Sequence, residues 1–366
     1  MSQTSDKDLK NFVDKVAETS HLRVAKDLGD GYVKLRPSEA QRRQAQQDIR
    51  CVEDATIELL RNSRDAGANN IYLATNTEEN FRHLLIIDDG CGVPETHHET
   101  IFEPYVTSKL DSMSMDSWGV HGRGMALYSI KENAEDAHVV NSNNKLGCAI
   151  AVKCDTKKLG EKRDQSSFPE FYVNENSELV VRGPKNILRT ACEFAVESRD
   201  SVNVYIGSPV EIAATLYNQK SDSLNVKAVF NEPDNKTKLV NLLSYSSDVH
   251  DFKNYARELG IFLSKRTARR IMDGDIKPQA SLLERIANKG IDGKNLDITD
   301  VTSVYRSKPK SRSLKLEDMD KAALAKAVSS EFSNIADKYY LDKSIEPKVT
   351  VKGSKISISF ETRENS

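Results

Sequence analysis

Apolar and polar residues alternate along this chain of 366 residues in a pattern that predicts an α+β protein. From about residue 39 the apolar positions recur at helical spacing, which predicts a long helix that carries residues 58–68. The continuous apolar run at residues 84–87 predicts a short buried strand. A second helix is expected over residues 126–133, and a second strand over residues 148–152.

The pattern changes after residue 156. Residues 157–167 are expected to form a charged linker, followed by a small α/β unit that either completes the first layer or forms a separate domain. Strands are expected at 179–181, 202–206, 348–351 and 355–360, with Gly353-Ser354 as a hairpin turn, and helices at 185–196, 209–218, 255–261, 263–274, 282–287 and 316–340. The predicted domains are residues 1–160, 161–240, 241–300 and 301–366.

The first predicted helix carries three polar side chains that share a face. Glu58, Asn62 and Asp65 are separated by four and three residues, and such offsets stack on an α-helix. Two carboxylates and an amide oxygen therefore converge on one small volume. Hard oxygen ligands of this kind suit a hydrated Mg²⁺ with phosphate.

A second polar group follows the buried strand. Asp88 stands at the strand end, where its carboxylate can accept a hydrogen bond from an exocyclic amine. Gly90 and Gly92 follow, and glycines let a flat base approach the backbone. We therefore expect a base pocket at this edge.

A glycine-rich segment precedes the helix expected at residues 126–133. It consists of Gly119, Val120, His121, Gly122, Arg123, Gly124 and Met125. Free backbone N–H groups and the positive end of a helix dipole can hold phosphates at such a place.

The order of these elements resembles the GHKL ATPase superfamily. Its members include gyrase B subunits, topoisomerase VI B subunits, the mismatch-repair protein MutL, heat-shock chaperones and sensor histidine kinases. The resemblance covers roughly residues 45–155 and implies a GHKL (Bergerat) α/β sandwich that binds ATP and Mg²⁺. It makes Glu58 the base that polarises the attacking water, Asn62 the Mg²⁺ ligand and Asp65 its support.

The same resemblance implies a base pocket and a phosphate site. Asp88 would bind the adenine amine, and the glycine-rich segment at residues 119–125 would lie along the phosphates. Residues 101–109 resemble the stretch before the ATP lid, so Lys109 is expected to reach a phosphate and residues 110–118 to form the lid. One departure is Gly147-Cys148, where many members have Gly-Thr, and a thiol is a poor substitute for that hydroxyl.

Composition narrows the class of protein. The net charge of −2 excludes neither nucleic acid nor protein partners. No run of 18 apolar residues exists and the first residues lack the apolar core of a signal peptide, so we expect a cytoplasmic protein without a membrane partner. Five cysteines, an odd number, fit reduced thiols.

Residues 252–292 carry a second functional signal. Their three expected helices resemble a helix-turn-helix module, with Ser264 as the cap of the second helix. The second helix presents a broad cationic face made of Lys265, Arg266, Arg269 and Arg270. Such a face can neutralise phosphates, so DNA is the expected partner, weighed against a solvated helix in an ordinary bundle. Backbone binding is favoured, because residues 265–270 contain no Asn or Gln.

These expectations combine into a Mg²⁺-dependent ATP hydrolase whose lid closure is coupled to DNA binding, with an ATP-dependent homodimer as the expected assembly. The nearest resemblance is to topoisomerase VI B subunits. The C-terminal region is too short for their full transducer domain, so DNA cleavage would require a separate subunit. A histidine-kinase-like phosphotransferase using His21 and a non-hydrolysing nucleotide-gated scaffold remain as alternatives.

Overall fold

The computed structural model describes residues 23–36, 49–107, 114–116, 119–121, 124–173, 179–219, 233, 237–290, 347–352 and 355–359, with single positions between 322 and 332. The chain divides into two compact units. The first comprises Met1–Asn174 and Leu179–Thr302, and the second comprises Glu175–Glu178 and Ser303–Ser366.

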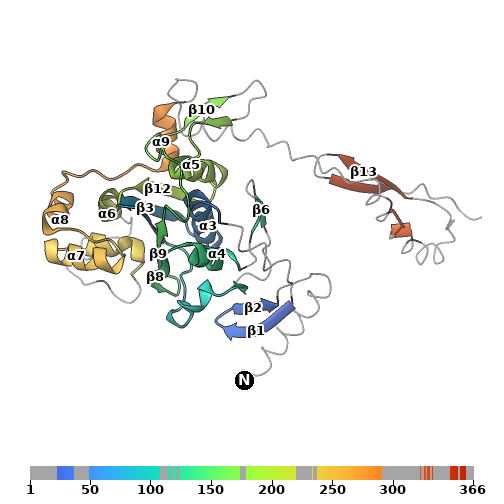
Figure 1. The fold of residues 1–366 in the computed structure, drawn as a ribbon, viewed down its shortest axis with the longest axis horizontal. Coiled ribbons are helices and arrows are strands. Elements are labelled where there is room, and N and C mark those ends of the chain that lie inside the picture. The colour runs from blue at the N-terminus through green and yellow to red at the C-terminus, as the bar shows by residue number, and fades with distance from the viewer. Residues whose placement is uncertain are drawn as a thin grey trace, which may run out of the picture. The chain divides into compact units, whose positions relative to one another are not determined.

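A five-stranded sheet forms the centre of the first unit (Figure 1). Its strand order is β12 (Asn203–Gly207), β3 (Asn70–Glu78), β4 (Phe81–Asp88), β9 (Gly147–Asp155) and β8 (Asp136–Asn143). All neighbours are antiparallel except β12 and β3, which are parallel. The strands β4 and β9 confirm the two predicted strands, whereas the pattern did not predict β3 or β8.

Helices cover both faces of this sheet. On one face α3 (Val52–Asp65), α4 (Ala126–Asn133) and α5 (Ile187–Glu197) pack together, and α9 (Leu282–Lys289) packs on α5 and β12. On the other face lie α6 (Pro209–Asn218), the 3-10 helix η4 (Leu239–Tyr245), α7 (Val249–Glu258) and α8 (Lys265–Met272). Alternate residues of each strand therefore face two different helical layers.

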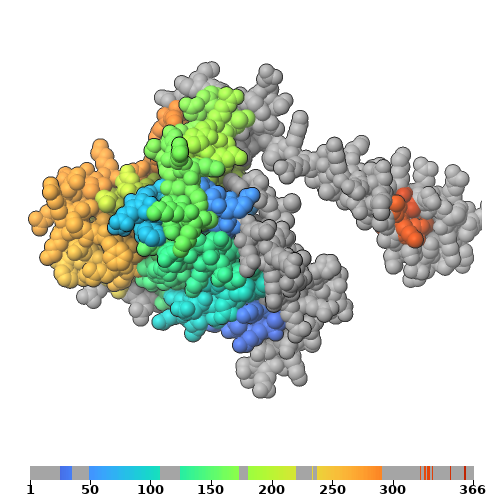
Figure 2. Space-filling view, viewed as in Figure 1, coloured from blue at the N-terminus to red at the C-terminus, as the bar shows by residue number. Residues whose placement is uncertain are grey.

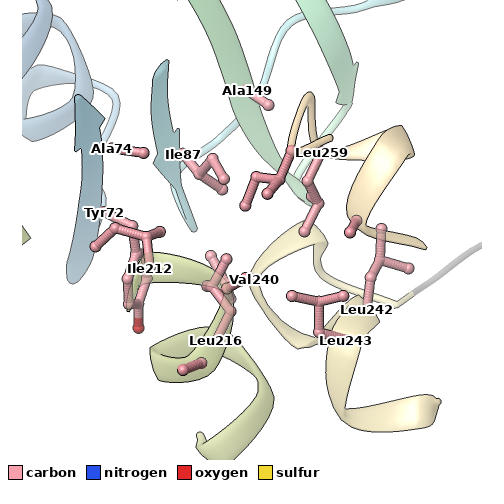
Figure 3. Packing of buried hydrophobic residues seen from close by; sticks show 14 of the residues in the cluster. Tyr72, Ala74, Ile87, Ala149, Ile212, Leu216, Val240, Leu242, Leu243 and Leu259 are labelled. Atoms are coloured by element: carbon pink, nitrogen blue, oxygen red, sulfur yellow. The ribbon is translucent and has the colours of Figure 1, made fainter. Parts of the chain in front are cut away.

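The second layer is held by one hydrophobic cluster. Tyr72, Ile87 and Ala149 of the sheet face Ile212, Leu216, Val240, Leu243 and Leu259 of the helices (Figure 3). The same cluster includes Phe252 of α7 and Ile271 of α8, both fully buried. The helices around residues 249–272 thus share their core with the central sheet.

The remaining elements are short. A three-stranded sheet is formed by β1 (Arg23–Gly29), β2 (Tyr32–Arg36) and β5 (Val106–Thr107), and two 3-10 helices, η1 (Glu95–His97) and η2 (Thr100–Phe102), precede β5. Two hairpins follow in the first unit: β6 (Ser114–Asp116) with β7 (Gly119–His121), and β10 (Glu170–Val173) with β11 (Leu179–Arg182). The second unit contains the hairpin of β13 (Lys348–Lys352) and β14 (Lys355–Ser359).

Several predicted elements differ from the observed ones at their ends. Helix α3 begins at Val52, and residues 49–51 are not helical, because Cys51 has an extended backbone at the cap. The predicted part at residues 39–48, the turn at Gly353-Ser354 and most of the helix at residues 316–340 lie outside the described residues. Helices α4 and α6 have the predicted bounds.

The α/β unit predicted at residues 161–240 completes the central layer. Strand β12 pairs along β3 with its register running from Asn203 opposite Asn70 to Gly207 opposite Ala74. Of the two alternatives for this unit, the structure therefore supports a continuation of the sheet. The predicted boundaries after residues 160 and 240 both lie within the first compact unit. Whether these segments are separate folding units stays a prediction.

The expected linker at residues 157–167 is packed against the sheet. Arg82 of β4 makes a bidentate ion pair with Glu161, at 2.7 and 3.1 Å. The buried Glu53 accepts hydrogen bonds from the Lys162 backbone and from Gln165. The high density of charge indicated a solvated linker, whereas Glu161 pairs with Arg82 of the sheet and the segment also binds Glu53 of α3.

The three helices predicted at residues 252–292 all form, but not as one module. Helices α7 and α8 pack on each other, and α8 packs on α6, while α9 packs on α5 and β12 in the opposite layer (Figure 1). The arrangement of a compact three-helix unit is therefore not observed, since the third helix buries Leu282 and Ile286 elsewhere.

Candidate functional site

Helix α3 carries one half-exposed strip on an otherwise buried surface. Glu58, Asn62 and Asp65 lie on it, together with Asp54 and Arg64, while the other residues between positions 52 and 63 are buried. Offsets of three and four residues place the strip on one side of the helix. The structure thus gives these three polar groups the shared face that the spacing predicted.

Glu58 is not an isolated carboxylate. The Arg61 guanidinium donates a hydrogen bond to Glu58 Oε1, and the Arg61 side chain is 5% exposed whereas that of Glu58 is 20% exposed. Charge-assisted hydrogen bonds of this kind fix the position of a carboxylate. Arg61 was not among the predicted site residues, although its spacing of three residues from Glu58 on a helix was the available signal.

Asn62 presents an unsatisfied polar atom. Its amide nitrogen Nδ2 is buried and has no hydrogen-bond partner. Because the two ends of an amide exchange by rotation about its terminal torsion, the same position can hold its oxygen. Next to it on the strip, Asp65 accepts a hydrogen bond from Arg64 at 3.2 Å. No group of three or more His, Cys, Asp or Glu suited to a metal ion occurs among the residues that the structure describes.

Asp88 lies at the end of β4 and faces α3. Leu84, Ile86 and Asp88 alternate to this face, since side chains of a strand repeat every two residues. Ser63 Oγ donates to Asp88 Oδ2 at 2.8 Å, and the Gly90 backbone donates to Oδ1 at 2.9 Å. The hydrogen bond from Ser63, which directly follows Asn62, brings the α3 strip and the strand end into one site.

Burial perturbs the Asp88 carboxyl. It is 4% exposed, and desolvation raises its pKa to about 6, while the hydrogen bonds from Ser63 and Gly90 oppose the rise. The neighbouring Asp89 adds to the rise. Asp89 itself accepts hydrogen bonds from the backbone of Asn69 and Asn70 and therefore has a structural role.

Three glycines beside Asp88 allow close backbone contacts. A Cβ at Gly92, whose φ is +69°, would come within 2.0 Å of the Asn143 oxygen. A Cβ at Gly147, with φ +97°, would come within 2.1 Å of the backbone oxygen of Asp88. A Cβ at Gly90 would meet the Ala66 oxygen at 2.9 Å. The turn after β4 can therefore pack against α3 and against the β8–β9 turn only without these side chains.

Cys148 lies directly opposite Asp88 in the β4–β9 pairing and is buried. Burial raises the pKa of its thiol, so the thiol is uncharged. A hydroxyl is nevertheless present nearby. Ser142 of β8 pairs with Cys148 in register, donates to the Gly147 oxygen at 2.9 Å and accepts from the Val93 backbone at 2.7 Å. Ser142 was not predicted as a site residue, because strand β8 was not predicted.

The glycine-rich segment differs from the predicted loop. Gly119, Val120 and His121 form β7, paired with β6, whereas Gly122, Arg123 and Lys109 lie outside the described residues. Gly124 has φ +66°, and its carbonyl accepts from the Tyr105 backbone at 2.9 Å. Met125 caps α4 without a side-chain hydrogen bond. Since α4 packs on α3, the end of this segment lies beside the helix that carries Glu58.

The cationic face of α8 is distant in sequence from this site. Lys265, Arg266, Arg269 and Arg270 are all exposed, while Ala268 and Ile271 of the same helix are fully buried. Ser264 Oγ accepts from the Thr267 backbone at 3.0 Å, which confirms its predicted role as cap. Arg270 makes an ion pair with Asp275 at 3.7 Å. The helix contains no acidic residue.

A family of known proteins matches the region just described. Residues 49–169 match the family described as "Histidine kinase-, DNA gyrase B-, and HSP90-like ATPase". The chain therefore contains a GHKL ATPase domain at residues 49–169. This domain extends beyond the predicted boundary at residue 160 and includes the packed segment that had been expected to be a linker.

Individual relatives carry the name DNA mismatch repair protein MutL. The protein of Clostridium perfringens strain ATCC 13124 is 31% identical over 46% of this chain and 25% of its own length. That of Thermus thermophilus strain ATCC BAA-163 is 37% identical over 23% of this chain and 15% of its own length. That of Clostridium botulinum strain ATCC 19397 is 29% identical over 52% of this chain and 30% of its own length.

The chain thus spans less than a third of the length of these curated relatives. They are distant homologues and are MutL proteins, whereas the motif order suggested topoisomerase VI B subunits as the nearest resemblance. Within the described residues, no helix combines the length and the apolar character that crossing a membrane requires.

Proposed function

We propose that this protein is a Mg²⁺-dependent ATP hydrolase of the GHKL type whose nucleotide state is coupled to DNA binding. The observation that carries this proposal is the half-exposed strip of Glu58, Asn62 and Asp65 on an otherwise buried helix, joined to Asp88 through Ser63. On this strip Asn62 Nδ2 is buried without a hydrogen-bond partner, which is costly, and a polar ligand bound at the strip would satisfy it.

The donor set fits a magnesium nucleotide. Asn62 offers an unsatisfied amide whose oxygen is a hard ligand, and Mg²⁺ uses few protein oxygens when phosphates and waters complete its shell. We assign Asn62 to the metal and Asp65 to its support. Bound Mg²⁺ would neutralise charge that develops on the phosphates.

Glu58 is the proposed general base. Its carboxylate accepts a proton from the attacking water, and Arg61 holds that carboxylate in place by its hydrogen bond. Removal of the carboxylate should therefore abolish turnover and leave nucleotide binding largely intact.

Asp88 is assigned to the base. Its two oxygens already accept from Ser63 and Gly90, and each retains capacity for a further donor such as an adenine amine. We assign Gly90 and Gly92 to shaping the base pocket, because they let the turn that follows Asp88 pack closely against Ala66 and Asn143.

The phosphates are assigned to the glycine-rich segment at residues 119–125 and to Lys109, and residues 110–118 to a closing lid. Free N–H groups at the start of α4 would hold negative charge without a dedicated cation. Lid closure around nucleotide and an ATP-dependent homodimer complete the proposal.

DNA is assigned to the exposed cations of α8, and the relatives named for DNA mismatch repair support a DNA-associated ATPase. A physical connection exists between α8 and the site. Gly260, in the turn before α8, packs so closely on Leu85 of β4 that a Cβ there would lie 3.2 Å from it, and β4 ends at Asp88. If the two sites are coupled, DNA must change ATP affinity by the factor by which ATP changes DNA affinity.

A finer proposal is the ATPase subunit of a topoisomerase VI-like assembly, in which a separate subunit cleaves DNA. Co-purification with a DNA-cleaving partner would favour this proposal.

Steady-state phosphate release from Mg²⁺-ATP, with and without duplex DNA, tests the proposal. We expect DNA-stimulated turnover that is lost in Glu58→Ala and retained in Glu258→Ala, which removes an exposed carboxylate from α7 as a matched control. ATP binding without turnover in the wild type would instead indicate a nucleotide-gated scaffold. Transfer of the phosphate to His21 would indicate a histidine-kinase-like phosphotransferase.

A further inference from the structure

Phe262 is the one large apolar side chain that is exposed among the side chains the structure describes, and it is 78% exposed. It lies in the turn between α7 and α8. Leaving an aromatic ring of this size in water forgoes the burial free energy that such side chains usually contribute. An isolated exposed aromatic beside a charged helix therefore calls for a physical explanation.

The turn that carries Phe262 is held by two backbone hydrogen bonds. The Ile261 backbone donates to the Ala256 oxygen at 2.8 Å, and the Gly260 backbone donates to the Arg257 oxygen at 2.9 Å. These two bonds, with Gly260 at φ +81°, form a Schellman motif that ends α7. Ile261 is buried and Leu263 is half-buried, so the backbone directs the ring between them outward.

The charge beside this ring is unbalanced. Lys265 and Arg266 occupy the first turn of α8, where the helix dipole disfavours cations, and no acidic residue is present in that turn. Lys265, Arg266 and Arg269 make no ion pair with any residue the structure describes. By helical geometry the four cations span an arc of about 140°, opposite the buried residues of α8.

We infer that Phe262 and the cationic face of α8 form a binding platform for single-stranded nucleic acid. Phosphates would contact the cations, and an unpaired base would stack on the Phe262 ring, which is sequence-tolerant because every base has a π-face. In a duplex the faces of the bases are covered by their neighbours, so the ring has nothing to stack on. The inference rests on the proposed nucleic-acid role of α8 and specifies its ligand.

An anionic lipid surface is the competing explanation for a ring beside cations. Membrane-surface helices bury a whole apolar face, whereas the apolar residues of α8 are buried in the protein core. One exposed ring provides too little apolar area for such binding. Residues 249–272, coloured yellow to orange, form a continuous part of the visible surface (Figure 2).

Fluorescence anisotropy with a labelled oligothymidylate of about 20 nucleotides, and with a duplex of equal length, tests the inference without added nucleotide. We expect tighter binding of the single strand. Phe262→Ala should weaken it roughly 5- to 150-fold, the equivalent of losing one stacked base, while Phe262→Tyr retains binding. Duplex binding should change little in either variant.

Charge is tested separately with matched triple variants. One triple variant combines Lys265→Gln, Arg266→Gln and Arg269→Gln. The slope of log affinity against log salt concentration for single-strand binding should become shallower by about 0.7 for each phosphate that is no longer neutralised. The control variant removes the same charge from exposed positions elsewhere, by Lys157→Gln, Arg163→Gln and Lys185→Gln. It should leave single-strand binding unchanged.

Equal affinity for duplex and single strand, unaffected by Phe262→Ala, would overturn the inference. Binding to anionic vesicles that depends on Phe262, with none to oligothymidylate, would also overturn it in favour of a lipid surface. ATP turnover without DNA, measured on the same preparations, distinguishes a failure of this inference from a failure of the proposed function. If turnover is intact but nucleic acid does not bind, only the platform is refuted. If the single strand binds but turnover is absent, the proposed ATPase is refuted.

Discussion

At the scale of single residues, Asp88 is the group whose chemistry depends most on its surroundings. It is buried, yet both of its oxygens accept hydrogen bonds that favour the ionised form. Protonation of Oδ1 would place a donor against the Gly90 N–H, which can only donate, and protonation of either oxygen removes an acceptor site for the amine. The carboxyl therefore accepts an adenine amine best when it is ionised.

This arrangement predicts a pH-dependent affinity for nucleotide. Since the pKa of Asp88 is raised to about 6, the ionised fraction falls from about 0.9 at pH 7 to about 0.1 at pH 5. We expect the affinity to fall about tenfold over this range. Titration calorimetry of ADP binding at several pH values measures it.

The nucleotide's own phosphate titrates in the same range, so Asp88→Asn serves as the control. That variant should bind weakly and retain only the pH dependence of the nucleotide. An identical pH profile in both proteins would remove Asp88 from base binding. In the absence of nucleotide the raised pKa acts on folding in the opposite direction, so the stability contributed by this carboxyl is lost as pH rises from about 4 to about 6.

Arg61 gives a second prediction at this scale. If it positions Glu58, then Arg61→Met should lower kcat about tenfold or more with little change in KM, because only the placement of the base is lost. Arg61→Lys should restore part of the rate. Steady-state kinetics measure both, and Arg50→Met, which breaks the exposed pair of Arg50 with Asp54, is the matched control. A rise in KM at constant kcat would assign Arg61 to binding instead.

The candidate site could be predicted from sequence only in part. The spacing of Glu58 and Asn62 is a local property of one helix, so their shared face followed from helical periodicity. Their meeting with Asp88 was implied by the resemblance alone. The hydrogen bond from Ser63 to Asp88 brings the two groups together and joins residues 25 positions apart. It depends on the packing of α3 on β4, which the sequence pattern does not give.

At the scale of elements, the segment from residue 156 to 169 shows how charge can fasten a segment to a sheet. The Arg82 side chain is 9% exposed, and its guanidinium is paired with both carboxylate oxygens of Glu161. If Glu161 were removed, the Arg82 guanidinium would remain buried and keep its desolvation cost without a compensating charge. The pair therefore affects stability mainly because its loss would leave an unpaired buried charge.

Glu161→Ala should therefore lower the free energy of unfolding by about 2–3 kcal/mol. The exposed pair of Lys158 and Glu135 provides the comparison, and Glu135→Ala should cost about 0.5 kcal/mol or less. Urea unfolding followed by circular dichroism measures both. Equal effects of the two substitutions would mean that the buried pair does not anchor the segment.

Element prediction succeeded where the signal was local. Helix α6 begins with the capping box of Ser208 and Glu211 and with Pro209, which mark a helix start in any context. Strand β8 was missed because it is an edge strand that alternates weakly and carries polar residues at its end. Gly119 was expected in a loop because glycine content does not distinguish a loop from a hairpin strand.

At the scale of the whole molecule, the first unit is built around the five-stranded sheet, with a helical layer on each of its faces. Helices α7 and α8, which carry the proposed nucleic-acid platform, bury Phe252 and Ile271 in the same cluster as Tyr72 and Ile87 of the sheet. The sequence suggested an attached module because the helical pattern and its basic residues are local, whereas the shared core is formed by residues far apart in the chain.

A shared core predicts cooperative unfolding of the ATPase sheet and the α7–α8 layer. Phe252→Ala removes a fully buried ring that packs edge-on against Tyr217, at 5.3 Å between ring centroids, and should lower the free energy of unfolding by about 3–5 kcal/mol. Phe252→Leu should lower the free energy of unfolding by less, because it leaves a smaller cavity.

Urea titrations test this cooperativity when they are monitored by far-ultraviolet circular dichroism and by binding of a fluorescent ATP analogue. Both signals should be lost in one transition, and each substitution should shift the urea midpoint of both signals by the same amount. A different result would be loss of part of the helical signal of Phe252→Ala at low urea, while nucleotide binding persists to the urea midpoint of the wild type. In that case α7 and α8 would be an independent domain. Any coupling between ATP and nucleic acid would then need a route other than this core.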